Sequence, residues 1–414
     1  MKRIKRIFIF ALAGTLVSGC GISLETAAQV KEDKYLHREE KSVTKTSEQD
    51  LGYPLSVNRE QKEEAEADCR AVMQMVREIY IQADRKESGS TSISSEAAKQ
   101  IVKKLQTTGR PVGADWFHIN MCNYEKFESF LEDCLNGKRA EIIMYEVYAN
   151  GSIGRIKFTF DGTDMYALST STAWSEENTP VMLFTSYSRL KKWEYTQKGW
   201  FIFKYCVPEP PQVSERINEN AMIRVKPLDE SYVEIAKKYL FSVGYMGNNL
   251  FCSNWDEAHM EAIDYNALFQ YFYSIKHQKA FFSGVYTEGI PKQEFEDLIT
   301  EYLPVTSEQL EQYAVYDIEK QTYGWARLGC GNYVPNAFES SSRPEIVGLI
   351  ENADGTVTLT IDAVCERAGS DCVMTHELTV QFTEDGGIRY LKNQILGDGL
   401  KKITEYQYRL GNRR

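Results

Sequence analysis

The sequence predicts an α+β fold in which helices precede an antiparallel meander sheet, and this order occurs twice along the chain. Apolar residues recur every three or four positions over residues 58–137, which is the helical period. The period then changes to two, and turn dipeptides such as Asn150-Gly151 separate the apolar runs. After a proline-rich segment at residues 208–211, the order of helices and then strands begins again.

Three helices are expected in the first unit, over residues 58–83, 95–106 and 123–137. Asn58 is the expected N-cap of the first helix, and Gln61 completes a capping box with it. A glycine, Gly137, ends the third helix. Strands are then expected from the alternation of apolar and polar residues, for example over residues 155–160 and 200–207.

The second unit repeats this order. Helices are expected over residues 229–241 and 264–277, at Pro291, and at a capping box formed by Thr306 and Gln309. Strands follow over residues 345–350, 357–364, 373–383 and 388–395. Each half resembles the cone-shaped fold of the nuclear-transport-factor-2-like superfamily. The resemblance is in the order of helices and strands and involves no signature residues.

The first twenty residues have the layout of a secretory signal. Basic residues including Lys2 and Arg3 precede an apolar run over residues 7–17, and small residues follow. As a helix this run is about 16 Å long, which is too short to cross a hydrocarbon core of roughly 30 Å. A permanent transmembrane anchor is therefore disfavoured.

This segment ends in Val17-Ser18-Gly19-Cys20, which resembles the lipobox of bacterial lipoproteins. The resemblance implies that a diacylglyceryl group, such as one carrying palmitate, is attached to Cys20 and that the leader is cut before it. An ordinary signal peptide with a coincidental cysteine is the alternative. Two acyl chains suffice for stable anchoring, so we expect a lipoprotein on the extracytoplasmic face of the cell membrane.

The domain organisation follows from these patterns. Residues 21–57 are polar with few aromatics and cannot bury enough surface to fold alone. The expected parts are a signal peptide (1–19), a disordered tether (20–57), a first α+β domain (58–207), a linker (208–221), a second α+β domain (222–396) and a C-terminal tail (397–414).

Charge and motifs narrow the possible functions. The formal net charge of −11 argues against nucleic acid or anionic lipid headgroups as the main partner. The sequence contains no Gly-x-Ser-x-Gly elbow, no phosphate-binding loop and no dinucleotide fingerprint. No cofactor is therefore expected, and an enzyme that assembles its site from scattered residues stays open.

Cysteines beyond Cys20 permit disulfides in an exported protein, although sequence does not give their pairing. One pair is better placed than the others, because Cys365 and Cys372 lie on either side of a short turn between two predicted strands. We expect either a disulfide there or two buried thiols that act as small apolar residues. A zinc site has weaker support, since Cys-x2-Cys is absent.

Two neighbourhoods hold polar residues beside a tryptophan. The first neighbourhood precedes an aromatic helix and contains Trp255, Asp256 and His259. It is either a metal or acid/base site or the entrance to the helix, with aspartates as caps. The pattern favours the helix entrance. Trp116 and His118 form a similar neighbourhood in the first half, where they line a cavity edge or close the core. No metal is expected at either.

His376 lies in an alternating strand, and we interpret it as a solvated or capped strand residue. The leading functional hypothesis is a lipoprotein that binds a small ligand or an envelope protein outside the membrane. One alternative is a hydrolase of envelope or other polymers with a pair of carboxylates that sequence cannot identify. The other is a structural adaptor of an envelope complex.

Overall fold

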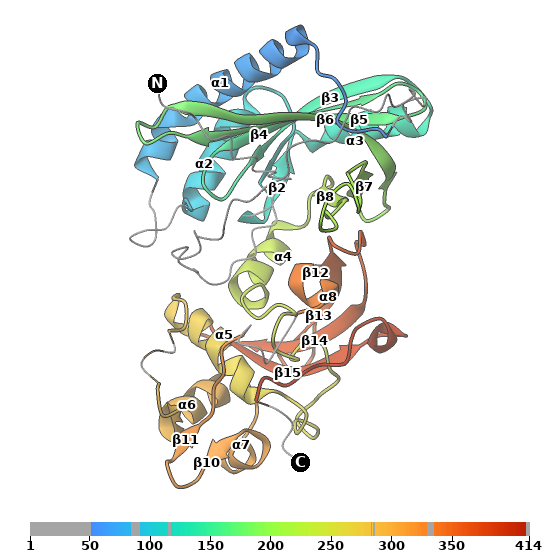
Figure 1. Cartoon of the computed structure of the whole chain (residues 1–414). Coiled ribbons are helices and arrows are strands. Elements are labelled where there is room, and N and C mark those ends of the chain that lie inside the picture. Colours follow the sequence, from blue (N-terminus) through green and yellow to red (C-terminus); the bar gives the residue numbers. More distant parts are fainter. Residues whose placement is uncertain are drawn as a thin grey trace, which may run out of the picture. The chain divides into compact units, whose positions relative to one another are not determined.

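The computed structural model describes residues 51–83, 92–114, 117–282, 284, 286–328 and 335–410. It confirms the α+β class, with helices followed by antiparallel sheets in each half of the chain (Figure 1). Cys20, the leader and most of the predicted tether lie outside the described residues. The remaining part of that segment is held in place, since the Leu55 N–H donates to the Tyr187 carbonyl over 2.9 Å.

The first half begins with helices. These are α1 (Arg59–Gln82), α2 (Ser95–Gln106) and, after the short strands β1 (Val112–Ala114) and β2 (Ile119–Cys122), α3 (Tyr124–Leu135). The predicted capping box at the start of α1 is confirmed: Asn58 accepts from the Gln61 backbone N–H, and the Gln61 side chain accepts from the Asn58 N–H.

A meander follows: β3 (Ala140–Val147), β4 (Ile153–Phe160), β5 (Met165–Trp174), β6 (Pro180–Tyr195), β7 (Trp200–Tyr205) and β8 (Asn220–Arg224). The sheet order is β2-β1-β3-β4-β5-β6-β7-β8, and all neighbours are antiparallel except β1 and β3. Strand β8 lies in a segment for which the sequence predicted no strand.

Both faces of this sheet are covered by helices. Side chains alternate across a strand, so neighbours on β3 face opposite ways. Tyr145 packs with α1 and α2, whereas Met144 packs with the α3 residues Phe127 and Leu131. Figure 1 shows α1 running along the sheet.

The second half also begins with helices, and its elements are α4 (Glu230–Ile235), a π-helical turn (Ala236–Leu240), α5 (Tyr265–His277), β9 (Ile290–Pro291), α6 (Lys292–Tyr302), α7 (Ser307–Tyr313), β10 (Tyr316–Asp317), β11 (Thr322–Tyr323), α8 (Ala337–Ser341), β12 (Ser342–Glu351), β13 (Val357–Cys365), β14 (Thr375–Phe382), β15 (Ile388–Ile395) and a 3₁₀ turn (Gly399–Lys401). The sheets have the orders β12-β13-β14-β15 and β10-β11-β9. Aromatic residues of α5 and α6 pack on the longer strands: the rings of Phe272 and Tyr390 stack 5.7 Å apart.

The C-terminal segment that the sequence predicted as a tail packs against this half. Arg409 is buried and donates to the Gly247 carbonyl and to Gln270. The Tyr406 hydroxyl donates to Asp264 over 2.8 Å. These contacts fix residues 404–410 without regular secondary structure.

Side chains from the two halves meet around Trp200, at the start of β7. Its ring is fully buried and packs with Ile202 and with Val364 of β13. The turn before it is tight: Gly199 has φ +87° and a Cβ there would lie 2.3 Å from the Lys226 Cβ, so glycine is required. This turn presents the Lys198 side chain to Asp362 of β13.

Candidate functional site

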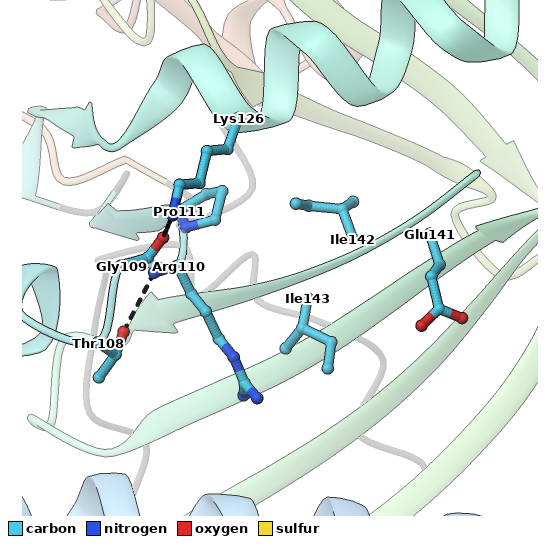
Figure 2. Close-up of a pocket in the computed structure, with 8 residues that line it drawn as sticks. All are labelled: Thr108, Gly109, Arg110, Pro111, Lys126, Glu141, Ile142 and Ile143. Carbon is cyan, nitrogen blue, oxygen red and sulfur yellow. Dashed lines mark hydrogen bonds between the residues drawn. The ribbon is translucent and has the colours of Figure 1, made fainter.

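Two hollows on the described surface are candidates for a functional site. The larger is an open groove of about 290 Å³ at the start of β3, beside α3. Figure 2 shows its lining, with Lys126 reaching down from α3 and Glu141 on the opposite side. The Lys126 ammonium donates to the Gly109 carbonyl over 2.5 Å, so this cation already has a protein acceptor.

Arg110 lines the groove and also belongs to an ion cluster that we call the Asp68 cluster, made of Glu64, Asp68, Arg110, Tyr145 and Arg155. Asp68 accepts hydrogen bonds from Arg110, from the Tyr145 hydroxyl and from Arg155 Nε. Burial raises the pKa of Asp68, but these hydrogen bonds outweigh burial and lower its pKa below the usual value. With two guanidiniums and two carboxylates, the cluster is balanced in charge.

The smaller hollow is a cavity of about 50 Å³ that we call the junction cavity. Its walls come from β2, β8, the region of α4 and β12. The charged residues in the lining are Arg224, Arg343 and Glu345, together with His118, and apolar side chains including Val233 and Phe241 complete it. Such a mixture of apolar walls and a few polar groups is typical of ligand sites.

Strand register explains how the charged residues meet. Arg343 and Glu345 are two apart on β12 and therefore share a face. Arg224 is the direct partner of Trp200 in the β7–β8 ladder. Both guanidiniums lie over the Trp200 ring, with Cζ 5.5 Å away for Arg224 and 4.7 Å away for Arg343.

Glu345 lies among these cations and is almost completely buried. Arg224 Nη1 lies 3.1 Å from its Oε1, and Trp200 Nε1 donates to the same oxygen over 3.3 Å. Burial raises the pKa of Glu345 above its usual value, although Arg224 and Arg343 act in the opposite direction. Burial also lowers the pKa of Arg224.

The remaining wall is held by a side chain of β2. Asn120 donates to the Leu228 carbonyl and accepts from the Leu228 N–H, each over 2.9 Å. This pair fixes the segment before α4 against β2. Next to it, the ring of His118 stacks on Phe241 with centroids 3.7 Å apart, and His118 has a left-handed backbone with φ 49°.

The sequence-predicted site residues do not form one site. His118 lines the junction cavity, whereas Trp255 is buried and donates through Nε1 to the Leu250 carbonyl. Asp256 and His259 pair over 2.8 Å in an exposed turn, and this pair raises the pKa of His259 and lowers that of Asp256. Trp116 lies outside the described residues.

The structure bears on two further interpretations made from the sequence, the cysteine pair and His376. Cys365 and Cys372 are both free thiols, so of the two alternatives expected for this pair the structure has the one without a disulfide. The hairpin register is the reason: Ser370 pairs with Cys365, and the Cys372 thiol lies beside Asp362 instead, 3.3 Å from its Oδ1.

His376 is not solvated but completely buried. Its ring lies between the Tyr245 hydroxyl, 3.0 Å from Nε2, and the Asn393 side-chain oxygen, 2.6 Å from Nδ1. Burial lowers the pKa of His376 to about 4, although the bond to Asn393 opposes this. His376 is therefore a neutral core residue at pH 7.

Arg224, Arg343 and Glu345 were missed by sequence reasoning. Arg224 lies just after the predicted linker (208–221), where the sequence predicted no strand, and the predicted strand over residues 345–350 began only at Glu345. If the predicted strand had been extended two residues before Glu345, the alternation of side chains would have placed Arg343 on the same face. In the part of the chain that the structure describes, no three His, Cys, Asp or Glu residues gather as a metal site requires.

Comparison with known proteins gives one match. Residues 62–409 match the model of a family of unknown function, DUF6070. No curated protein and no solved structure matches the chain, so the resemblance to nuclear-transport-factor-2-like folds stays a prediction. Within residues 51–410, apart from the gaps given above, no helix is long and apolar enough to cross a membrane. Because the match covers most of the sequence, the chain belongs to the DUF6070 family.

Proposed function

We propose that this chain is a lipid-anchored extracytoplasmic binding protein that takes up a small ligand in the junction cavity. The string Val17-Ser18-Gly19-Cys20, placed after a basic and then an apolar segment, supports the anchor. A diacylglyceryl group on Cys20 holds the protein at the membrane.

The observation that carries the binding function is the lining of the junction cavity. Side chains from β2, β8, α4 and β12 converge there, and they combine an apolar wall with two guanidiniums. Positions so far apart in the sequence meet only in the folded chain, where Asn120 and the β7–β8 ladder hold them in place. A pre-formed hollow with few, fixed polar groups is what a small-molecule site requires.

The anchor is tested by labelling cells with a palmitate analogue and separating membrane from soluble fractions. We expect the full chain to carry the label and to sediment with membranes, and Cys20→Ser to lose the label. Cys206→Ser is the matched control, since it removes another thiol outside the leader. Label and membrane retention that are unchanged in Cys20→Ser contradict the anchor.

Binding is tested by measuring the melting temperature of the purified full chain with a panel of small anionic, neutral and cationic compounds. We expect at least one compound to raise the melting temperature. In Ala236→Leu, the larger side chain occupies space in the cavity lining, and the ligand-induced rise should disappear. A panel without any stabilising compound, or a rise that is unchanged in Ala236→Leu, contradicts binding in the cavity.

A polymer hydrolase is the second candidate, and one observation favours it. Glu345 and Asp362 are direct cross-strand partners on β12 and β13, and directly opposite residues have Cβ atoms about 5 Å apart. Burial raises the pKa of Glu345, as in a general acid. We expect any hydrolysis of envelope polysaccharide by the full chain to be abolished in Glu345→Gln, and activity that survives this change excludes the pair.

A further inference from the structure

We propose that the groove of Figure 2 binds an extended acidic peptide of a protein partner, which adds as a strand to the open edge of β3. The groove shares no lining residue with the junction cavity, so a partner here is independent of the proposed function. Three features support such a partner: the unpaired backbone of β3, the fixed loop beside it and the charge of Lys126.

Strand β3 has a neighbouring strand along only part of one side. β4 pairs with the whole of β3, from Ala140 to Val147, whereas β1 pairs only with Tyr145 and Glu146. Residues 140–143, which we call the β3 edge, therefore have a strand on one side only within the described part of the chain. Such an edge presents unpaired N–H and C=O groups to any extended chain that lies beside it.

The pairing of Tyr145 shows which backbone groups of β3 are open. The Tyr145 N–H donates to the Pro111 carbonyl over 2.9 Å, so the backbone groups of Tyr145 point towards β1. Because this direction alternates along a strand, the N–H and C=O groups of Glu141 and Ile143 point to the same side, into the groove. Pro111 ends the pairing with β1, since it has no N–H to donate to the Ile143 carbonyl.

The β3 edge is accessible from the groove. Glu141 is exposed, and Ile142 and Ile143 are half-buried. In Figure 2, Ile142 lies on the side of Lys126, and Ile143 lies on the opposite side with Arg110. An added strand would lie about 4.8 Å from β3 and would place its own side chains alternately on these two sides. Residues 140–143 span about 10 Å, which is enough to pair with three or four peptide residues.

The loop that forms one wall of the groove is fixed by its own hydrogen bonds. The Arg110 N–H donates to Thr108 Oγ1 over 3.3 Å, and the Asn123 side chain donates to the Arg110 carbonyl over 2.8 Å. These bonds hold the wall in place before any peptide arrives. A pre-formed groove lowers the entropic cost of binding, because the protein side does not have to be ordered.

The charged side chains of the lining leave one positive charge without a counter-ion. Arg110 belongs to the Asp68 cluster, which is balanced in charge. Glu141 pairs with Lys157 over 2.9 Å. Lys126 is the remaining charged residue of the lining, and it forms no ion pair with any residue that the structure describes.

The Lys126 ammonium is available to a partner. The residue is exposed, and of the three N–H donors of an ammonium one is used, on the Gly109 carbonyl. Glu125, its neighbour on α3, does not line the groove. A glutamate or aspartate of an added strand therefore gains a charged hydrogen bond to Lys126. The negative net charge of the chain acts over longer distances, where salt screens it.

The test titrates the purified full chain with three capped hexapeptides by calorimetry in about 0.15 M salt. The first peptide alternates valine and glutamate, the second has glutamine in place of glutamate, and the third is the first with every backbone nitrogen methylated. The valine–glutamate peptide should bind at least about threefold more tightly than the valine–glutamine peptide. Methylation should weaken binding at least about tenfold, because it removes the donors to the β3 edge. Equal affinity of the methylated peptide overturns the added strand.

A variant pair tests the acidic class. Lys126→Gln should abolish the preference for glutamate over glutamine and leave the affinity for the valine–glutamine peptide unchanged, since glutamine can still donate to the Gly109 carbonyl. Lys103→Gln, at an exposed position of α2 outside the lining, is the matched control and should keep the preference. A preference that survives in Lys126→Gln overturns the assignment of an acidic peptide.

Hydrogen exchange of the full chain locates the bound peptide. At a peptide concentration ten times the dissociation constant, the Glu141 and Ile143 amides should exchange about tenfold more slowly. Protection at the junction cavity instead overturns a site at the β3 edge and supports the proposed function. Protection of the β3 edge that rises with protein concentration in the absence of peptide assigns this edge to a second copy and overturns the partner peptide.

A chain that binds none of the three peptides also overturns this inference. The proposed function is then still decided by the compound panel, because the panel is tested with Ala236→Leu in the other cavity.

Discussion

The Asp68 cluster and the charged residues of the junction cavity contain the same chemical groups with opposite outcomes. Asp68 accepts three hydrogen bonds, and its pKa falls below the usual value. Glu345 has an ion pair with Arg224 and one hydrogen bond from Trp200, and burial raises its pKa. The comparison teaches that burial of a carboxylate beside arginines stabilises the charge only where enough donors replace water.

The balance of charge differs as well. In the Asp68 cluster, two carboxylates face two guanidiniums, whereas the cavity lining has one carboxylate for two. Each cluster contains an arginine with one unpartnered nitrogen, namely Arg155 Nη1 and Arg224 Nε. Arg224 lines the junction cavity, whereas Arg155 is absent from the lining of the groove.

The largest expected effect is in the Asp68 cluster. Asp68→Asn leaves the buried Arg155 guanidinium without its main counter-ion, and we expect the free energy of unfolding to fall by about 4 kcal/mol. Urea unfolding of the full chain at pH 7 measures this change. Glu63→Gln, in an exposed pair with Arg59 on the same helix, is the control and should cost less than about 0.5 kcal/mol. Equal losses in the two variants would falsify the structural role.

The second prediction concerns how stability changes at acid pH. His376 and the Asp68 cluster are expected to lose stability in different pH ranges. His376 has a folded pKa of about 4, below its usual value of 6.5, so protonation favours the unfolded chain. Neutral His376 therefore adds about 3 kcal/mol to the free energy of unfolding above pH 6.5. This stabilisation is lost as the pH falls toward 4. The lowered pKa of Asp68 adds a loss only below its usual value of 3.8.

His376→Gln should therefore flatten the unfolding free energy between pH 6.5 and 4 and leave the loss below pH 3.8. Chemical unfolding at closely spaced pH values measures both ranges. A slope between pH 6.5 and 4 that is unchanged in the variant means that His376 is not the titrating group.

A smaller effect is expected for Glu345→Gln. Because its folded pKa is raised, Glu345 contributes more to stability when protonated, and this contribution is lost as the pH rises through that pKa. Glutamine resembles the protonated acid and keeps an acceptor for Trp200, so we expect a cost of less than about 1 kcal/mol at pH 7. A loss as large as that of Asp68→Asn, measured in the same urea experiment, would remove the distinction between the clusters.

Local signals made much of the fold predictable. The capping boxes Asn58–Gln61 and Thr306–Gln309 are formed as expected, because a cap depends only on residues three apart. The same local reasoning had the information to place His376 correctly. It is in phase with Leu378 and Val380, whose side chains face the core, and period-two alternation alone predicts its burial.

The candidate site was not predictable in this way. Arg224 and Glu345 meet only because β8 adds to the first sheet after a proline-rich segment, and that pairing has no local signal. The free thiols of Cys365 and Cys372 have a similar cause, since the hairpin register depends on the turn conformation rather than on spacing alone.

The most direct test of a ligand site at the junction is a crystal structure of the full chain grown with a compound that raises its melting temperature. We expect the compound in the junction cavity, in contact with Val233 and Ala236. The compound bound instead in the groove beside Arg110 and Lys126, or an ordered junction cavity without the compound at a saturating concentration, would contradict the account.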